Sequence, residues 1–203
     1  NMKFFCTQEN LNQILIAAEK IITKNNTLPV LSNVLLETEN GRLKVSATNL
    51  EIGASYWIGA KVEQNGAITV PSRILTSYIA KLPNKKINFE VKEYNTLNII
   101  TEEIITNIKG MDAKEFPIIP QLKEHGLGEV KNIDFKNALA ATIMASAASD
   151  VRPELSGACL SFDFSKETLT VAATDSFRLA EEIISFKKTS DDHTEAVSVI
   201  LPK

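Results

Sequence analysis

Apolar residues recur with a helical period in two stretches of the first half of the chain, which predicts two amphipathic helices set among short strands. The first predicted helix covers residues 9–24, and its apolar positions are Leu11, Ile14, Leu15, Ala18, Ile21 and Ile22. The second covers residues 73–82, with Ser72 as its N-cap and with apolar positions Ile74, Leu75, Tyr78, Ile79 and Leu82. Each helix therefore has one face suited to burial against a sheet.

The other apolar runs are short and rich in β-branched residues, which is typical of strands. They predict strands at residues 3–7, 34–37, 42–47, 52–62, 87–91, 97–101 and 104–109. Asn40-Gly41 lies between two of these runs and is a strong signal for a two-residue hairpin turn. The resulting order is close to βαββββαβββ, which indicates an α+β fold with antiparallel sheets rather than a parallel βαβ fold.

A second unit follows a predicted linker at residues 112–128, which contains Pro117, Pro120 and Gly126. The pattern then begins again. It predicts a strand at residues 129–133, an Ala-rich helix at residues 134–149, and strands at residues 158–164, 169–173 and 179–186.

The two units also share short sequences in the same order. Leu31-Ser32-Asn33 returns as Leu155-Ser156-Gly157 at an offset of 124 residues, and Ala47-Thr48-Asn49 returns as Ala173-Thr174-Asp175 at an offset of 126. A repeat of this length is a whole domain, because solenoid repeats are only about 20 to 50 residues long. We therefore predict one domain at residues 2–122 and a second, truncated copy at residues 128–203.

Composition adds limits on location and partners. The chain has 203 residues, of which 44% are hydrophobic and 23% are charged, as in an ordinary globular protein. No apolar run reaches the roughly 18 residues of a membrane span, so a cytoplasmic location is expected. Cys6 and Cys159 lie in apolar strand-like runs and are expected to be buried free thiols. The net charge of −3 excludes a protein that is basic all over, but not one with a basic patch.

The chain lacks the common catalytic and cofactor motifs. Its two histidines, His125 and His193, lie in polar loop-like stretches, and no phosphate-binding glycine motif or paired-cysteine motif occurs. We therefore expect no metal and no cofactor. An enzyme whose carboxylates carry no recognisable motif stays open as an alternative.

Basic residues recur on the polar sides of the predicted helices. Lys20 and Lys24 follow Gln13 at helical spacing, and Arg73 and Lys81 flank Ser77 in the same way. If the two helices lie side by side, these residues form one surface that contacts phosphates without reading bases. The alternative is an ordinary solvated helix face. In the second unit, the exposed side of the predicted helix carries Lys136.

Several motifs resemble the bacterial DNA polymerase III β subunits, the replicative sliding clamps. Residues 173–180, Ala-Thr-Asp-Ser-Phe-Arg-Leu-Ala, are similar to the family motif ATDGHRLA, and further matches lie at residues 2–4, 27–33, 70–73, 115–117 and 150–153. The resemblance implies a non-catalytic processivity factor that forms a ring around duplex DNA. Each protomer has three two-helix domains in this family, and two protomers join head to tail. We therefore expect this chain to lack the third domain and not to close a ring alone.

The resemblance also implies site residues and partners. The DNA-facing positions are Lys20, Lys24, Asn25, Arg73, Lys81, Lys136, Ser149 and Arg152. A cleft for peptides of polymerases, the clamp loader and repair proteins is formed by Leu155, Thr174, Ser176, Phe177, Arg178 and Leu179. Core packing is the alternative role for Phe177 and Leu179. Asn25 stands where the family often has Arg, and Ser176-Phe177 replaces Gly-His. A clamp-derived interaction module that no longer encircles DNA is the alternative function.

Overall fold

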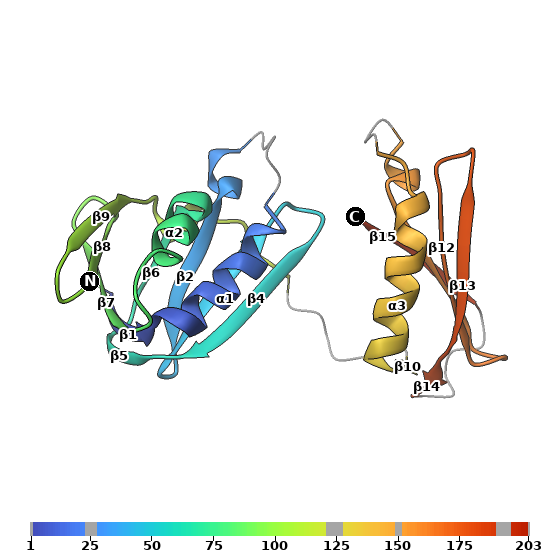
Figure 1. Ribbon diagram of the computed structural model, residues 1–203, viewed down its shortest axis with the longest axis horizontal. Coiled ribbons are helices and arrows are strands. Elements are labelled where there is room, and N and C mark those ends of the chain that lie inside the picture. Colours follow the sequence, from blue (N-terminus) through green and yellow to red (C-terminus); the bar gives the residue numbers. More distant parts are fainter. Residues whose placement is uncertain (1, 23–27, 121–127, 149–151, 190–195, 203) are drawn as a thin grey trace. The chain divides into compact units, whose positions relative to one another are not determined.

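The computed structural model describes residues 2–22, 28–120, 128–148, 152–189 and 196–202. The chain divides into two compact units, unit 1 at residues 1–121 and unit 2 at residues 122–203, which are treated separately below (Figure 1). Every strand pair in the described ranges is antiparallel, which confirms the predicted α+β class. No helix in these ranges is long and apolar enough to cross a membrane.

Unit 1 consists of two helices and two antiparallel sheets. Its elements are β1 (Lys3–Thr7), α1 (Gln8–Glu19), the 3₁₀ turn η1 (Pro29–Ser32), β2 (Asn33–Glu39), β3 (Arg42–Thr48), β4 (Gly53–Gly59), β5 (Lys61–Gln64), β6 (Ala67–Pro71), α2 (Ser72–Ile79), β7 (Lys86–Lys92), β8 (Thr96–Ile100), β9 (Ile105–Lys109) and the 3₁₀ turn η2 (Ala113–Glu115). One sheet has the order β4-β3-β2-β6 and the other β5-β1-β7-β8-β9. The helix α1 packs on β3 and β4, and α2 packs on β2 and β6.

A single core joins both helices to both sheets. Phe4 on β1 and Phe89 on β7 are fully buried and stack with their ring centroids 4.8 Å apart. Leu11 and Leu15 of α1 and Leu75 of α2 belong to the same buried cluster. The predicted apolar stripes therefore face the sheets, with one exception: Ile74 is 56% exposed, so its predicted burial is wrong.

The hairpin between β2 and β3 has the predicted turn. Asn40 and Gly41 have φ values of 49° and 73°, which are the two positive values that a type I′ turn needs. The prediction of a single strand at residues 52–62 is wrong, however. The chain leaves the first sheet after Gly59 and enters the second at Lys61, because β4 pairs with β3 whereas β5 pairs with β1.

Both helices of unit 1 end earlier than predicted. The backbone N–H groups of Ile21 and Ile22 donate to carbonyls three residues back, at 3.1 and 3.2 Å, so the regular helical ladder stops although both side chains still pack against the core. The N–H of Leu82 bonds Ile79 in the same way at the end of α2. The predicted N-cap is also wrong. Because β6 runs directly into α2, Pro71 is the N-cap and Ser72 is the first helical residue, with its hydroxyl buried and without a hydrogen-bond partner in the described ranges.

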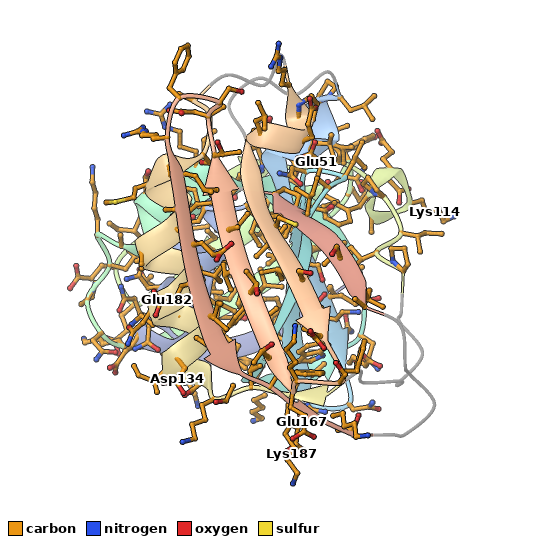
Figure 2. The ribbon with its side chains drawn as sticks, turned by 90° about the vertical axis from the view of Figure 1, so that its right-hand side faces the viewer. Glu51, Lys114, Asp134, Glu167, Glu182 and Lys187 are labelled. Atoms are coloured by element: carbon orange, nitrogen blue, oxygen red, sulfur yellow. The ribbon has the colours of Figure 1, made fainter. Side chains whose placement is uncertain are left out.

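Unit 2 repeats the first part of this topology. Its elements are β10 (Gly128–Glu129), α3 (Asn132–Thr142), the 3₁₀ turns η3 (Ile143–Ala145) and η4 (Pro153–Leu155), β11 (Gly157–Asp163), β12 (Thr168–Thr174), β13 (Leu179–Ser185), β14 (Lys187–Lys188) and β15 (Val197–Pro202). The sheet order β13-β12-β11-β15 matches β4-β3-β2-β6, and β10-β14 matches β1-β5. Figure 2 shows this sheet with α3 behind it. The repeat seen in the sequence is thus a repeat of structure.

Two predictions for unit 2 need correction. The strand predicted at residues 129–133 covers only residues 128–129, because α3 already begins at Asn132. The predicted helix at residues 134–149 ends at Thr142, whose hydroxyl donates to the Ala138 carbonyl at 2.8 Å before the chain tightens into η3. The sequence predicted one helix in this truncated copy, and the described part of unit 2 contains one α-helix, α3.

The two cysteines differ in environment, which gives a first test of the fold. Cys6 is 4% exposed, and burial raises the pKa of its thiol to about 12, whereas Cys159 is only half-buried, contrary to expectation. Because the thiolate is the reactive form, iodoacetamide at pH 8 is expected to alkylate Cys159 well before Cys6 in the native protein. Peptide mass spectrometry over time measures both rates. Equal native rates that match those in denaturant would contradict the buried position of β1.

Candidate functional sites

The basic residues of unit 1 lie on two helices that pack against each other. The Gln8 side-chain amide at the start of α1 donates to the carbonyl of Ile79 at the end of α2, at 2.8 Å, so the pair is antiparallel. Lys20 directly follows α1, and Arg73 is the second residue of α2, so these two lie toward the same end of the pair, with Lys81 toward the other. The two helices therefore lie side by side, as the predicted basic surface requires (Figure 1).

These cations are exposed and available. Among the described residues, Lys20, Arg73 and Lys81 form no ion pair, whereas Lys3, Lys44 and Lys85 are each bound to a glutamate. Two apolar side chains that sequence reasoning did not assign to this surface, Ile16 and Ile74, are 45% and 56% exposed on the same helices. The helix layer of unit 1 is therefore a cationic surface with apolar patches.

The described part of unit 2 has fewer exposed basic residues at the predicted DNA-facing positions than unit 1 has. Lys136 is exposed on α3, and Arg152 is exposed at the N-cap of η4, again without ion pairs in the described ranges. Lys24, Asn25 and Ser149 lie outside the described residues. Glu167 is exposed in the turn between β11 and β12 (Figure 2). Glu181 is exposed on the face of the unit 2 sheet that points away from α3, because it pairs with Ala172, whereas Glu182 pairs with the buried Val171 and lies on the α3 side.

The predicted partner-binding residues form the turn between β12 and β13. The Thr174 hydroxyl donates to the Arg178 carbonyl at 2.7 Å and accepts from the Ser176 backbone N–H at 3.1 Å. The Asp175 carboxylate accepts from the backbone N–H groups of Phe177 and Arg178, both at 3.0 Å, and from the Arg178 Nε at 2.9 Å. Ser176 has a φ of 78°, a conformation in which glycine is favoured, which explains why Gly suits this position.

Unit 1 has the same turn between β3 and β4. The Thr48 hydroxyl donates to the Ile52 carbonyl at 2.9 Å and accepts from the Leu50 N–H at 3.0 Å. Asn49 accepts from the N–H groups of Glu51 and Ile52, at 3.0 and 2.8 Å. The Thr-Asx pair therefore forms the same hydrogen-bonded turn in both units. The units differ in the residues at the tip of the turn, which are Phe177 and Arg178 in unit 2.

The tip residues of unit 2 point into solvent. Phe177 is 96% exposed and Leu179 is 68% exposed, so the alternative of core packing is wrong for both. Leu155 is half-buried in η4, where its backbone bonds Arg152 and Ala147. The structure therefore brings Thr174 to Leu179 together in one turn and places Leu155 in a separate segment that contacts β11.

The Asp175 side chain gives a prediction with a matched control. Bonds from the backbone N–H groups of Phe177 and Arg178, and from the Arg178 side chain, lower its pKa. A lowered carboxyl pKa stabilises the turn above the unfolded value of about 3.9, and this stabilisation is lost as the pH falls through the folded value. In D175N the turn persists, as with Asn49 in unit 1, but Arg178 loses its ion pair.

Amide NMR chemical shifts between pH 6 and pH 2 measure this difference. The Phe177 and Arg178 amides are expected to titrate in the native protein and not in D175N. The reverse variant N49D is expected to make the Glu51 and Ile52 amides titrate. Titration of the Phe177 amide in D175N would show that another group controls the turn.

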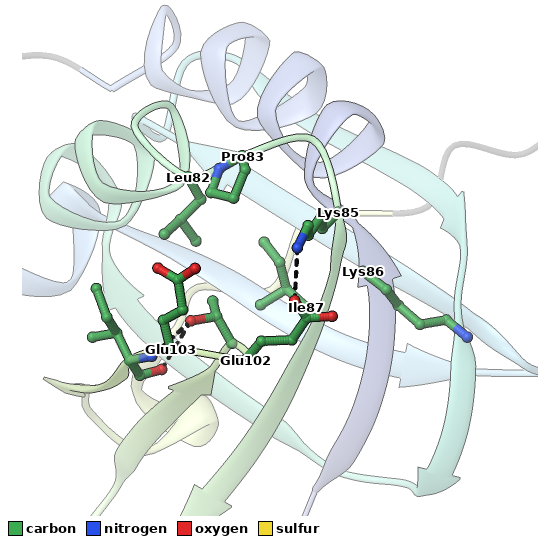
Figure 3. A pocket seen from close by; sticks show the side chains of 9 residues that line it. Leu82, Pro83, Lys85, Lys86, Ile87, Glu102 and Glu103 are labelled. Carbon is green, nitrogen blue, oxygen red and sulfur yellow. Dashed lines mark hydrogen bonds and ion pairs between the residues drawn. The ribbon is translucent and has the colours of Figure 1, made fainter.

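One further hollow lies in unit 1 beside the start of β9 (Figure 3). Leu82, Pro83 and Ile87 line it, and the Lys85–Glu102 ion pair, at 2.6 Å, crosses its rim. This pairing raises the pKa of Lys85 and lowers that of Glu102. Its volume is about 60 Å³, well below the roughly 300 Å³ of small-molecule sites. Within the described ranges, no cluster of three or more His, Cys, Asp or Glu side chains is arranged to hold a metal ion.

Comparisons with known proteins agree with the fold. Residues 2–120 match the family model of the DNA polymerase III beta subunit, N-terminal domain, and residues 129–203 match that of its central domain. The beta sliding clamp of Synechococcus elongatus is 30% identical over 183 residues, which are 88% of this chain and 48% of that protein. The chain spans about half the length of the curated relatives it matches.

Solved structures show the same fold. The DNA polymerase sliding clamp from Bacillus subtilis superposes with a TM-score of 0.89 at 24% identity, covering 99% of this chain and 54% of that one. The Helicobacter pylori beta clamp bound to a DNA ligase peptide superposes with a TM-score of 0.85 at 24% identity, covering 99% of this chain and 56% of that one. At these identities, both superpositions show that the chain has the same fold as these two proteins.

Proposed function

Because the chain belongs to the DNA polymerase III beta subunit family, the bacterial sliding clamps, we propose that this protein encircles duplex DNA and confers processivity on a replicative polymerase. The observation that carries the proposal is the helix layer of unit 1, where Lys20, Arg73 and Lys81 are exposed and form no ion pair in the described ranges. The protein acts in the cytoplasm and does so without catalysis of its own.

The chemistry of this surface suits sliding. Duplex DNA carries about one negative charge per 1.7 Å, and Lys and Arg neutralise phosphates without reading the base sequence. Lys136 on α3 and Arg152 extend the same role to unit 2. The exposed carboxylate of Glu181 disfavours DNA on the outer face of the unit 2 sheet. Lys24, Asn25 and Ser149 complete the proposed set.

Ring closure requires a surface that joins protomers, and β9 offers one. It is one of the two edge strands of the sheet β5-β1-β7-β8-β9. Ile104 just before it and Ile105 at its start are 52% and 67% exposed. An edge strand has unpaired backbone groups that another chain can extend, so we assign β9 to the head-to-tail contact of a homodimeric ring.

Partner proteins are proposed to bind at the β12–β13 turn. The Helicobacter pylori relative binds a DNA ligase peptide. In this chain Phe177 and Leu179 offer exposed apolar area, and Arg178 is held by Asp175 at the rim. Such a cluster suits a short peptide with a hydrophobic anchor and an acidic group. Leu155, Thr174 and Ser176 complete the proposed cleft, which serves the polymerase, the clamp loader and repair proteins.

The test is topological. The protein at its natural length, loaded by its clamp loader, is expected to co-elute with nicked circular DNA in gel filtration and to be lost from that DNA after linearisation. Equal retention on circular and linear DNA would rule out a ring and leave ordinary binding. Absence from both forms, with peptide binding intact, would support an interaction module that no longer encircles DNA.

A further inference from the structure

A segment of unit 1 that follows β9 folds back over the outer face of the sheet β4-β3-β2-β6. Met111 pairs with Thr69 of β6 through two backbone hydrogen bonds, of 2.9 and 3.2 Å. This approach requires Gly110, because a Cβ there would lie 2.2 Å from the Thr69 carbonyl oxygen. After η2 the chain crosses the sheet face, with Phe116 only 7% exposed and Ile118 92% exposed. The predicted linker is therefore folded in its first part.

The side chain of Ile119 fills a depression that small residues leave in this face. A Cβ on Gly53 would lie 2.9 Å from the Ile119 Cγ2 atom, so the two residues are in direct contact. Next to Gly53 along the sheet, Ser46 and Ser55 are joined by a hydrogen bond of 2.8 Å. The remaining groove has a volume of about 820 Å³ and is lined by Trp57 and by residues 113, 114 and 116–120 among others.

The internal repeat shows which residue of unit 2 is equivalent to Gly53. Gly53 pairs with Thr48 directly after the first turn, just as Leu179 pairs with Thr174 directly after the second. Ile119 therefore covers, in unit 1, the position that Leu179 holds in unit 2. Leu179 is one of the residues proposed to bind partner peptides.

We infer that the outer face of unit 1 is a second peptide-binding surface, which the chain's own residues 116–120 occupy. Its ligand is an extended apolar peptide with an aromatic residue three positions before an aliphatic one, as in Phe116-Pro117-Ile118-Ile119. A tethered segment has an effective concentration in the millimolar range, so it excludes free peptides of similar affinity. The inference rests on the proposed function only in treating Leu179 as a partner residue.

Trp57 gives a direct readout, because it is the single tryptophan of the chain and lines the groove. The probe is the synthetic peptide Glu-Phe-Pro-Ile-Ile-Pro, and the receptor is the full chain carrying Phe116→Ser and Ile119→Ser. We expect Trp57 emission in this variant to change saturably with the peptide. The unaltered protein should need at least ten times more peptide for the same change. The control Ile118→Ser alters the exposed neighbour and should behave like the unaltered protein.

A variant without a saturable response, or an unaltered protein that responds equally well, would overturn the inference. If the double variant does not fold, as judged by circular dichroism, Gly53→Leu replaces it. That side chain takes the place of Ile119, so Trp57 emission should change without peptide and should not respond to it; unchanged emission would also overturn the inference. Peptide binding at unit 2 is followed separately through Arg178→Ala. Its failure would contradict the proposed partner cleft and leave the Trp57 result unaffected.

Discussion

Phe89→Ala is expected to lower the free energy of unfolding of unit 1 by about 3 to 5 kcal/mol, the usual cost of removing a buried phenyl ring. Phe89 is 0% exposed and stacks on Phe4 with an interplanar angle of 8°. It belongs to the buried cluster that residues of both helices and both sheets of unit 1 form. Truncation therefore removes a buried ring and leaves Phe4 without its stacking partner. The well-packed surroundings can fill the resulting cavity only in part.

Thermal unfolding followed by circular dichroism measures this effect. Phe177→Ala is the matched control, because it removes the same atoms from a side chain that is 96% exposed. Surface substitutions away from structural features change stability by about 0.5 kcal/mol or less. Equal losses in the two variants would mean that Phe89 is not part of a packed core.

The second large effect concerns DNA. Replacing Lys20, Arg73 and Lys81 together with alanine is expected to weaken binding to duplex DNA by about 100-fold at 0.15 M salt, since each phosphate contact contributes about 0.9 to the slope of log K against log salt. That slope should fall by about 2.7 in magnitude. The loss should be the same for unrelated DNA sequences, because these residues contact the backbone.

Fluorescence anisotropy with a labelled duplex, repeated from 0.05 to about 0.3 M salt, gives both quantities. The control removes Lys3, Lys44 and Lys85, which are bound to Glu63, Glu37 and Glu102. It changes the net charge by the same amount at residues outside α1 and α2. If both triple variants lose affinity equally, overall charge rather than this surface controls DNA binding.

Local signals in the sequence predicted the local parts of the fold. Asn40-Gly41 determines its own turn, because both residues tolerate positive φ. The change of sheet between β4 and β5 has no such local signal. It depends on the pairing of β5 with β1, residues nearly sixty positions away, and the apolar pattern continues across it. Helix ends were misplaced for a related reason, since Ile21 and Ile22 stay in the core after the helical hydrogen bonds have stopped.

The candidate sites divide in the same way. Helical spacing was enough to predict that Lys20, Arg73 and Lys81 are exposed, but whether the helices lie side by side depends on long-range packing such as the Gln8–Ile79 hydrogen bond. The covering of the outer face by residues 116–120 was missed, because Gly53 and Gly110 look like ordinary turn glycines. Their role is visible only once the segment that approaches them is known.

The duplicated turn has a consequence for how specificity can change over time. In both units the loop is held by two side chains that bond to backbone groups. A threonine hydroxyl donates to a backbone carbonyl, and an Asn or Asp oxygen accepts from a backbone N–H. The side chains at the following positions take no part in the scaffold, apart from the link between Arg178 and Asp175. Apart from Leu50 and Ser176, whose φ values of 76° and 78° favour glycine, those positions can therefore mutate almost freely. A lineage can acquire or exchange binding partners there without any change to the domain that carries the loop.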